Sequence, residues 1–168
     1  EEEQIKKLDS ILQPILGFPV ATLDQYGLMM LYNYAIMSSM PCQKFKSYET
    51  ELLALAKNDK KEVKTFETAV QQMTVLNQTY SNQELYNLLL DIHSYKADFN
   101  QATKHYLKEE LEACVNLIAS DRYMSKKAIE IMVTNRNKNW VEQLQQILPK
   151  EATFIAVGAA HLTGKKGV

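Results

Sequence analysis

The sequence comprises 168 residues, of which 46% are hydrophobic and 23% charged, so it has enough apolar side chains for the core of one globular domain. Its 19 basic and 20 acidic residues leave a formal charge of −1, which provides no basic surface for nucleic acid or for an anionic membrane. We therefore expect a single domain over residues 1–168 and no nucleic-acid partner.

Neither a transmembrane segment nor a cysteine motif is predicted. The longest apolar stretch, residues 28–37, is interrupted by Asn33 and has about half the length that a bilayer requires, so we expect a core helix there. Cys42 and Cys114 do not form a Cys-x-x-Cys pair, which favours two buried thiols over a zinc or redox motif. No signal peptide is visible, but the sequence starts with Glu1 rather than methionine, so this absence does not decide the cellular compartment.

The first part of the chain is predicted to form helices that end at prolines. Residues 1–13 carry one apolar face and predict a short amphipathic helix stopped by Pro14. Residues 22–40 are apolar on almost every side and precede Pro41, which predicts a helix at the centre of the domain. A further helix is expected over residues 48–57.

A short strand is predicted over residues 63–66, and Glu67 follows it directly. Two later positions have the pattern of a capping box, in which a hydroxyl caps a helix and a side chain three residues on reaches back. These pairs are Thr68 with Gln71 and Ser81 with Glu84. Each predicts the first turn of a helix.

Two helical regions are expected in the second half of the chain. One starts near Asp98 and carries Leu107, Leu111, Cys114 and Ile118 at fourfold spacing. The other covers residues 125–148, and Arg136 lies in its apolar stripe. A buried guanidinium is costly unless an anion or several carbonyls meet it, because it cannot lose its proton. Alternatively, the chain bends near Asn135 and Asn137, and the arginine reaches water.

The C-terminal segment predicts a second strand and a site. Residues 153–157 are apolar without alternation, as expected for a strand buried on both faces, and Gly158 allows a turn before His161. Ligands of open α/β sheets bind at the carboxyl ends of the strands. If the two predicted strands are parallel neighbours, Glu67 and His161 gather at the same edge of the sheet.

A carboxylate and an imidazole at one edge can bind a divalent metal with a position left for water. Arg136 can then hold a substrate carboxylate or a developing oxyanion. The alternative for Glu67 is a carboxylate stabilised by a helix terminus. His93 and His105 are expected on the surface, and the absence of nucleophile-elbow, zinc-helix and phosphate-loop motifs disfavours the commonest hydrolases, zinc proteases and nucleotide-binding proteins.

The predicted fold class is α/β, rich in helices, with a small central sheet that helices surround. Two strands do not make an independent sheet. Either strands have been missed, or the remainder comes from chain outside this sequence or from a second copy. Because unpaired strand edges favour association, we expect self-association or a missing complementary segment.

The sequence resembles the TraB/PrgY/GumN/Tiki family in two segments and in the spacing between them. The first is Asn135-Arg136-Asn137 with Trp140, and the second is the glycine-rich segment 154–167. The two segments look like the family's Arg-Asn helix and its second Gly-x-x-His loop. More weakly, residues 63–71 resemble the family's Leu-Glu-Thr segment. The resemblance covers approximately residues 48–168.

This resemblance implies an α/β domain of two related halves whose strand ends assemble one site. Tiki-type members are metal-dependent proteases, PrgY-type members curb a peptide pheromone, and many GumN-like bacterial members are exported. Carried over by position, His161 would be a metal ligand, Glu67 the acidic ligand or base, and Arg136 their buried polar partner. A divalent metal (Mn, Co or Zn), a peptide or protein substrate and an exported location follow only from the resemblance.

The sequence departs from the family pattern at both ends, because the first Gly-x-x-His loop and the final strands are missing. Neither Gly17 nor Gly27 is followed three positions later by histidine. We therefore expect an incomplete GumN-like domain and a metal-dependent hydrolase of peptides that is weakly active or inactive as it stands. The alternatives are a non-catalytic peptide-binding domain of the same fold and a helical interaction module in which Glu67 and Arg136 form a structural ion pair.

Overall fold

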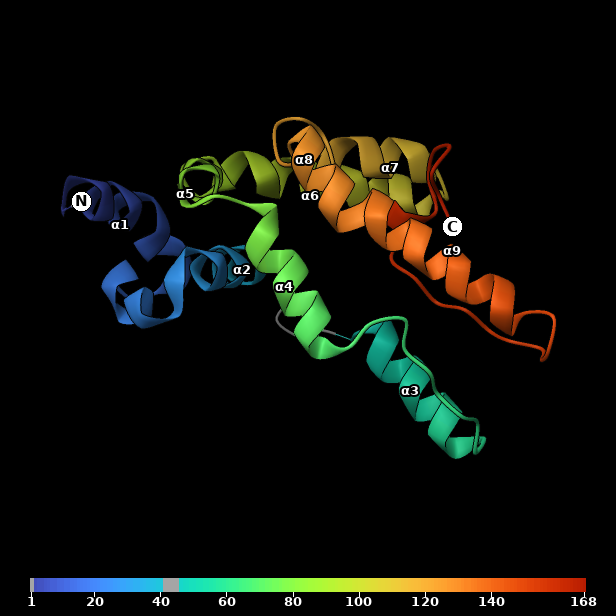
Figure 1. Cartoon of the computed structure of the whole chain (residues 1–168). Coiled ribbons are helices and arrows are strands. Elements are labelled where there is room, and N and C mark those ends of the chain that lie inside the picture. The colour runs from blue at the N-terminus through green and yellow to red at the C-terminus, as the bar shows by residue number, and fades with distance from the viewer. Residues whose placement is uncertain (1, 41–45) are drawn as a thin grey trace.

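The computed structural model of the chain describes residues 2–40 and 46–168, and it is 71% helical. Within those residues it contains no strand, so the predicted α/β fold with a central sheet is wrong. Figure 1 shows helices joined by loops, with α1 and α2 toward one end of the molecule and α7 and α9 toward the other. Residues 63–66 and 153–157, both predicted as strands, lie in loops.

The predicted strands fail because neither has a partner. Among residues 2–40 and 46–168, no hydrogen bond between two backbone groups joins residues 63–66 or 153–157 to another segment. A strand exists through its ladder with a neighbour, and an apolar β-branched sequence alone does not supply one. The C-terminal segment returns beside α9 as a loop instead (Figure 1).

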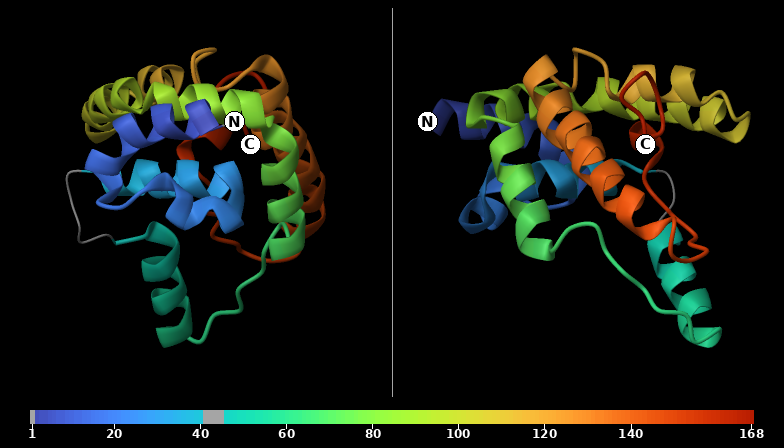
Figure 2. Two further views of the ribbon diagram at one scale, coloured as in Figure 1. Left: turned by 90° about the vertical axis from the view of Figure 1, so that its left-hand side faces the viewer. Right: turned by 45° about the vertical axis from the view of Figure 1, so that its right-hand side comes forward.

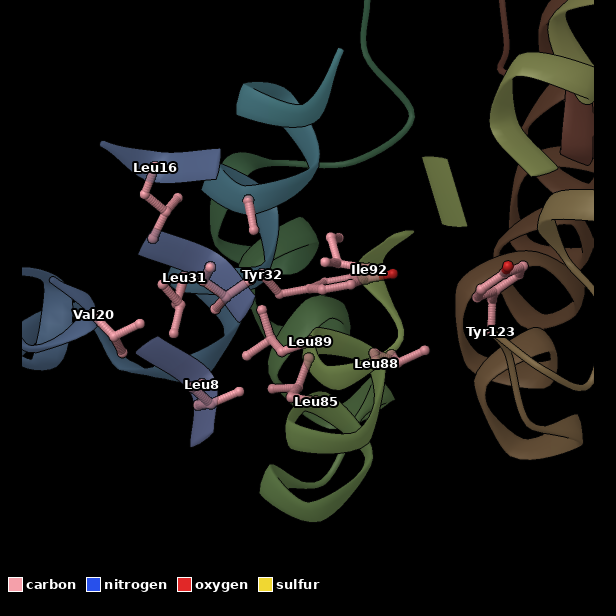
Figure 3. Close-up of a cluster of buried hydrophobic side chains, with 12 residues drawn as sticks. Leu8, Leu16, Val20, Leu31, Tyr32, Leu85, Leu88, Leu89, Ile92 and Tyr123 are labelled. Carbon is pink, nitrogen blue, oxygen red and sulfur yellow. The ribbon is translucent and has the colours of Figure 1, made fainter. Parts of the chain in front are cut away.

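One core lies where the N-terminal helices meet α5 (Asn82–Leu90). The contributing elements are α1 (Glu2–Leu16), the 3₁₀ turn η1 (Val20–Tyr26) and α2 (Gly27–Ser39). Figure 3 shows their leucines pointing toward one another and toward Tyr32. The helix predicted as central does contact α1, η1, α5 and α6, but it also exposes Met30 and Met37.

Two predicted boundaries in this region shift. Helix α1 continues past Pro14 to Leu16, because Leu12 and Leu16 both pack in the core and hold the last turn. The predicted helix over residues 22–40 is split at Gly27, whose φ of 75° is accessible to glycine and ends the 3₁₀ turn. The predicted stop at Pro41 and the predicted buried thiol of Cys42 lie outside the described residues.

The middle of the chain forms α3 (Tyr48–Asn58) and α4 (Ala69–Thr79), which pack little. No residue of α3 is buried, and α4 buries only Thr79. The left view in Figure 2 shows α3 projecting below the other helices. Glu67 lies in the loop between these two helices, and this loop brings it to the rest of the molecule.

Both predicted capping boxes are confirmed. The hydroxyl of Thr68 accepts from the backbone N–H of Gln71, and the Gln71 side chain accepts from the backbone N–H of Thr68. Ser81 and Glu84 make the same reciprocal pair at the start of α5, with distances of 3.2 and 2.7 Å. The Ser81 hydrogen bonds lower the pKa of Glu84. Four residues of local sequence therefore fix each of these helix starts.

Replacing Ser81 by alanine should lower the free energy of unfolding by about 1 kcal/mol, because the start of a core helix loses its cap. Urea denaturation followed by circular dichroism measures the change. Ser81→Thr is the matched control, since it keeps the hydroxyl and should retain most of the stability. Equal losses in the two variants would show that the hydroxyl contributes nothing.

The fourfold spacing near Asp98 does not mark one continuous helix. The segment divides into α6 (Ile92–Leu107) and α7 (Leu111–Ile118), which fold back on each other. Glu109, at a φ of 62°, is the residue between them with a left-handed backbone. Cys114 is a buried free cysteine, as predicted.

The last helical region is confirmed as an almost continuous run, with one irregular turn. It comprises α8 (Lys126–Ile129), the π turn η2 (Glu130–Thr134) and α9 (Asn135–Ile147), and a short 3₁₀ turn, η3 (Ala159–His161), follows the returning loop. Across residues 2–40 and 46–168, no helix combines the length and hydrophobicity required to cross a bilayer. This finding agrees with the prediction of no transmembrane segment.

Candidate functional site

Three segments that are distant in sequence meet at the start of α9. The helix contributes Arg136, the loop before α4 contributes Glu67, and η3 contributes His161. Gln143, two turns further along α9, donates to the backbone carbonyl of Phe66 at 3.2 Å and so fixes the loop that carries Glu67. The structure therefore brings together all three predicted site residues, although no sheet edge does so.

Arg136 and Glu67 form a bidentate ion pair with little exposure to solvent. Nε of Arg136 lies 3.0 and 3.1 Å from the two carboxylate oxygens, and Nη2 lies 2.8 Å from Oε2. Their side chains are 17% and 11% exposed, respectively. The predicted carboxylate partner of Arg136 is confirmed, and the alternative of an arginine that reaches water is wrong.

The π turn supplies a further acceptor for the same guanidinium. Nη1 of Arg136 donates to the backbone carbonyl of Met132, in the π turn, at 3.1 Å. On its other side, the guanidinium lies 4.8 Å from the centre of the Trp140 ring, which in turn stacks on Phe66. Carboxylate, carbonyl and aromatic face together compensate the charge that Arg136 cannot lose.

His161 is buried, and its orientation is set by Asn137. Nδ2 of Asn137 donates to the backbone carbonyls of His161 and Lys166, at 3.1 and 2.7 Å. Its Oδ1 is therefore the acceptor for Nδ1 of His161, 2.6 Å away, which places the imidazole proton on Nδ1. Nε2 is left with a lone pair, 3.5 Å from Nη1 of Arg136.

The surroundings keep this imidazole neutral. Burial, and then the positive charge of Arg136, lower the pKa of His161 to about 4, against the smaller opposing influence of Glu67. At neutral pH the ring is an uncharged acceptor in contact with a charged donor. The cluster of Glu67, Arg136 and His161, called the arginine cluster below, thus carries a carboxylate, a guanidinium and a neutral imidazole.

The arginine cluster does not fit a catalytic divalent metal as it stands. Within residues 2–40 and 46–168, no three His, Cys, Asp or Glu side chains gather closely enough to hold a metal ion. Both carboxylate oxygens of Glu67 accept from Arg136, and the guanidinium places a positive charge beside Nε2 of His161. A second cation in this position would meet repulsion and only two ligands, where catalytic sites use three.

Sequence reasoning gave Asn137 and Trp140 no role of their own, although both are buried at this site. Asn137 joins α9 to the C-terminal loop through its side-chain amide. The sequence signal for this role is an asparagine directly after the arginine of the apolar stripe. Nε1 of Trp140 is buried without a hydrogen-bond partner among the described residues. An unpaired buried donor is uncommon in folded proteins, so this N–H marks a position where an acceptor would be stabilised.

The two other histidines lie away from the arginine cluster. His93 is exposed on α6, and Nδ1 of His105, at the end of the same helix, is 2.6 Å from a carboxylate oxygen of Glu110. Glu110 lies on the surface, and its hydrogen bond to His105 lowers the pKa of its carboxyl. The two side chains contribute nothing to the site, as expected from their positions off the apolar stripes.

Comparison with known proteins identifies a family. The model of the TraB/PrgY/gumN family matches residues 1–168. No curated protein and no solved structure matches the chain.

Proposed function

The chain belongs to the TraB/PrgY/gumN family, and we propose that the arginine cluster is one part of a peptide-hydrolysing site with low activity in residues 1–168 alone. The observation that carries the proposal is the state of His161. Its tautomer is fixed by Asn137, its ring is neutral, and its Nε2 lone pair lies toward Arg136. A general base requires such an uncharged, oriented nitrogen.

Each member of the cluster has a role in this proposal. Nε2 of His161 takes a proton from the water that attacks the peptide carbonyl. Arg136 stabilises the negative charge that develops on the carbonyl oxygen, and Glu67 holds the guanidinium in position. Activity is low because a base with a pKa of about 4 accepts a proton poorly at neutral pH.

The cofactor that the family resemblance implies is a divalent metal, manganese, cobalt or zinc. The described residues offer at most His161 and Glu67 as ligands, and Glu67 is engaged by Arg136. Metal-dependent hydrolysis therefore requires at least one ligand from outside the described residues, together with release of Glu67. The peptide class of substrate rests on the same resemblance.

Peptide hydrolysis measured with and without added manganese, cobalt or zinc tests the proposal. We expect slow turnover by residues 1–168 and faster, metal-dependent turnover by the product of the gene's full reading frame. In that product, His161→Ala should lower turnover by about 100-fold, which is the lower end of the range for loss of a general base. His93→Ala is the matched control, because His93 is exposed and lies away from the cluster. The hydrolytic proposal fails if no peptide is hydrolysed or if turnover is unaffected by His161→Ala. Turnover that is independent of metal would remove only the metal from the proposal.

One observation favours a second candidate function, that of a non-catalytic peptide-binding domain. Glu67 and Arg136 satisfy each other in a bidentate pair, an arrangement typical of a structural contact. Under this alternative, peptides bind without turnover, and His161→Ala weakens folding rather than catalysis. Calorimetric titration with the same peptides separates the two functions, because it detects binding where hydrolysis is absent.

A further inference from the structure

Residues 153–157 form an uncoiled segment whose backbone groups have no partner among the described residues. The backbone hydrogen bonds of the chain stop at Lys150, after the end of α9, and resume at Gly158, whose carbonyl accepts from the N–H of His161. None of residues 153–157 is buried. Their N–H and carbonyl groups therefore face solvent and are available to a binding partner.

The segment has the side-chain pattern of an extended backbone. Phe154 and Ala156 are exposed, with Phe154 at 80%, whereas Ile155 and Val157 are half-buried. An alternation of period two is that of an extended chain, in which successive side chains point to opposite sides. Gly158 continues the segment with extended angles, φ −61° and ψ 146°. Figure 1 shows the segment running back along α9 without coiling.

The composition of the segment favours pairing with another extended backbone. Aromatic and β-branched side chains, which prefer such pairing, make up most of it: Thr153, Phe154, Ile155 and Val157. Exposed strand edges in proteins usually carry a charge or a proline that prevents pairing with other chains. Residues 153–157 contain neither, so nothing in their sequence opposes a paired backbone.

The segment also leads directly to the arginine cluster. Gly158 and η3 follow it, and η3 carries His161. The other uncoiled segment, residues 63–66, leads to Glu67, but the carbonyl of Phe66 already accepts from a side chain of α9, and Lys64 lies in an ion pair. Residues 153–157 are thus the open, apolar backbone beside the cluster.

We propose that residues 153–157 bind the peptide substrate by pairing with its backbone, so that the site takes extended, proline-free segments of peptides. The proposal rests on the hydrolytic function of the arginine cluster. An extended peptide has free donors and acceptors at the spacing of those in the segment, whereas a helix satisfies its own. Hydrolysis at His161 requires substrate backbone beside it, which favours a peptide over a second copy of the chain as the occupant. Two paired segments are only marginally stable, as suits a substrate whose products must leave.

Fluorescence anisotropy of a labelled peptide of alternating valine and threonine, titrated with the whole chain, tests the pairing. The peptide should bind saturably. The same peptide with methylated amide nitrogens along its centre should bind at least about tenfold more weakly, because it keeps its side chains but has lost its backbone donors. Equal affinities for the two peptides would show that the backbone is not recognised.

Proline substitutions test which part of the chain pairs. Ile155→Pro and Ala156→Pro remove N–H groups that point to opposite edges of an extended segment, and neither group has a hydrogen bond within the described residues. Because one peptide pairs along one edge, one of the two variants should bind the probe at least about tenfold more weakly and the other like the wild-type chain. Val63→Pro, in the other uncoiled segment, is the matched control and should leave binding unchanged. Circular dichroism checks that all three variants keep their helices.

Several outcomes would overturn the proposal. These are no binding of the probe, and equal effects of Ile155→Pro and Ala156→Pro. A wild-type dimer in sedimentation equilibrium that either proline variant returns to the 19.3 kDa monomer would mean that a second copy pairs with the segment instead. Such self-association, expected from sequence, stays a prediction.

Turnover measured on the same peptides separates this proposal from the hydrolytic one. Hydrolysis that neither amide methylation nor the proline variants affect would reject the pairing and keep the hydrolytic function. Binding that follows the expected pattern without any hydrolysis would support the pairing and reject the hydrolytic function.

Discussion

Arg136→Met should lower the free energy of unfolding by about 3–5 kcal/mol, because it leaves the carboxylate of Glu67 buried without its partner. Glu67 accepts three hydrogen bonds from the guanidinium and is 11% exposed, so water cannot readily replace what the substitution removes. The pair also joins the loop before α4 to α9, so its loss separates two segments. Urea denaturation measures the change.

The matched control is Lys64→Met, which removes the other ion pair between these two regions. Nζ of Lys64 lies 2.8 Å from Glu151, but both side chains are about half exposed. We expect no measurable change in the denaturation midpoint. A similarly small effect of Arg136→Met would show that the arginine is solvated.

A second substitution separates the interaction energy of the ion pair from the other effects of replacing Arg136. Arg136→Met combined with Glu67→Leu removes both charges, and a buried pair replaced by apolar side chains of similar volume often restores stability. The double variant should therefore recover much of the loss caused by Arg136→Met alone. The resulting double-mutant cycle gives the interaction energy of the pair, provided that each single variant keeps its fold.

The features that were predicted correctly depend on nearby residues or on a single unavoidable physical requirement. Ser81 and Glu84 are three residues apart, so their capping box is written in local sequence. Arg136 lies far from Glu67 in sequence, but a guanidinium in an apolar stripe must find an acceptor. This requirement predicted the kind of partner, a carboxylate or backbone carbonyls, and both are found.

The sheet was mispredicted because a strand depends on a neighbour that local sequence does not contain. Residues 153–157 have the composition of a buried strand, yet hydrogen-bond pairing is a property of two segments. The breaks within the predicted helices were not predicted, for a related reason. Apolar spacing continued through Glu109, where the backbone turns, and through the π turn that supplies Met132 to the arginine.

The site was predicted in its residues but not in its arrangement. Glu67, Arg136 and His161 were expected at the edge of a sheet, whereas helix α9 gathers them through the side chain of Arg136. The contribution of Asn137 was not predicted, because it depends on hydrogen bonds to a loop more than 20 residues away. The partners there are two backbone carbonyls and the imidazole of His161. Sequence spacing along one helix carries no information on such contacts.

The stability of the chain should fall by about 3 kcal/mol as the pH decreases from 6.5 to 4, because His161 must take up a proton. Its pKa is about 4 in the folded chain and about 6.5 when unfolded, so the unfolded state binds more protons in this window. The contribution of the neutral ring is present in full above pH 6.5, is lost progressively below it, and levels off below pH 4.

Carboxylates also titrate in this range, so the measured quantity is the difference between the wild-type chain and His161→Asn. Asparagine can still donate toward Oδ1 of Asn137 but has no proton to gain. The difference should appear between pH 6.5 and 4, whereas His93→Asn, at an exposed position, should follow the wild-type curve. Parallel curves for wild type and His161→Asn would show that the imidazole is accessible to solvent.

Arg136 connects this pH dependence to the first prediction. The guanidinium is the second cause of the low pKa of His161, after burial, and Glu67 acts in the opposite direction. In Arg136→Met, this repulsion disappears, so the pKa of His161 in the folded chain should rise. The loss of stability should still begin near pH 6.5, the unfolded-state pKa, but should end at a higher pH and be smaller. Nuclear magnetic resonance titration of the imidazole in both chains measures this shift directly. An unchanged midpoint would mean that burial alone keeps the ring neutral, and that the 3.5 Å approach of Nη1 to Nε2 has no electrostatic consequence.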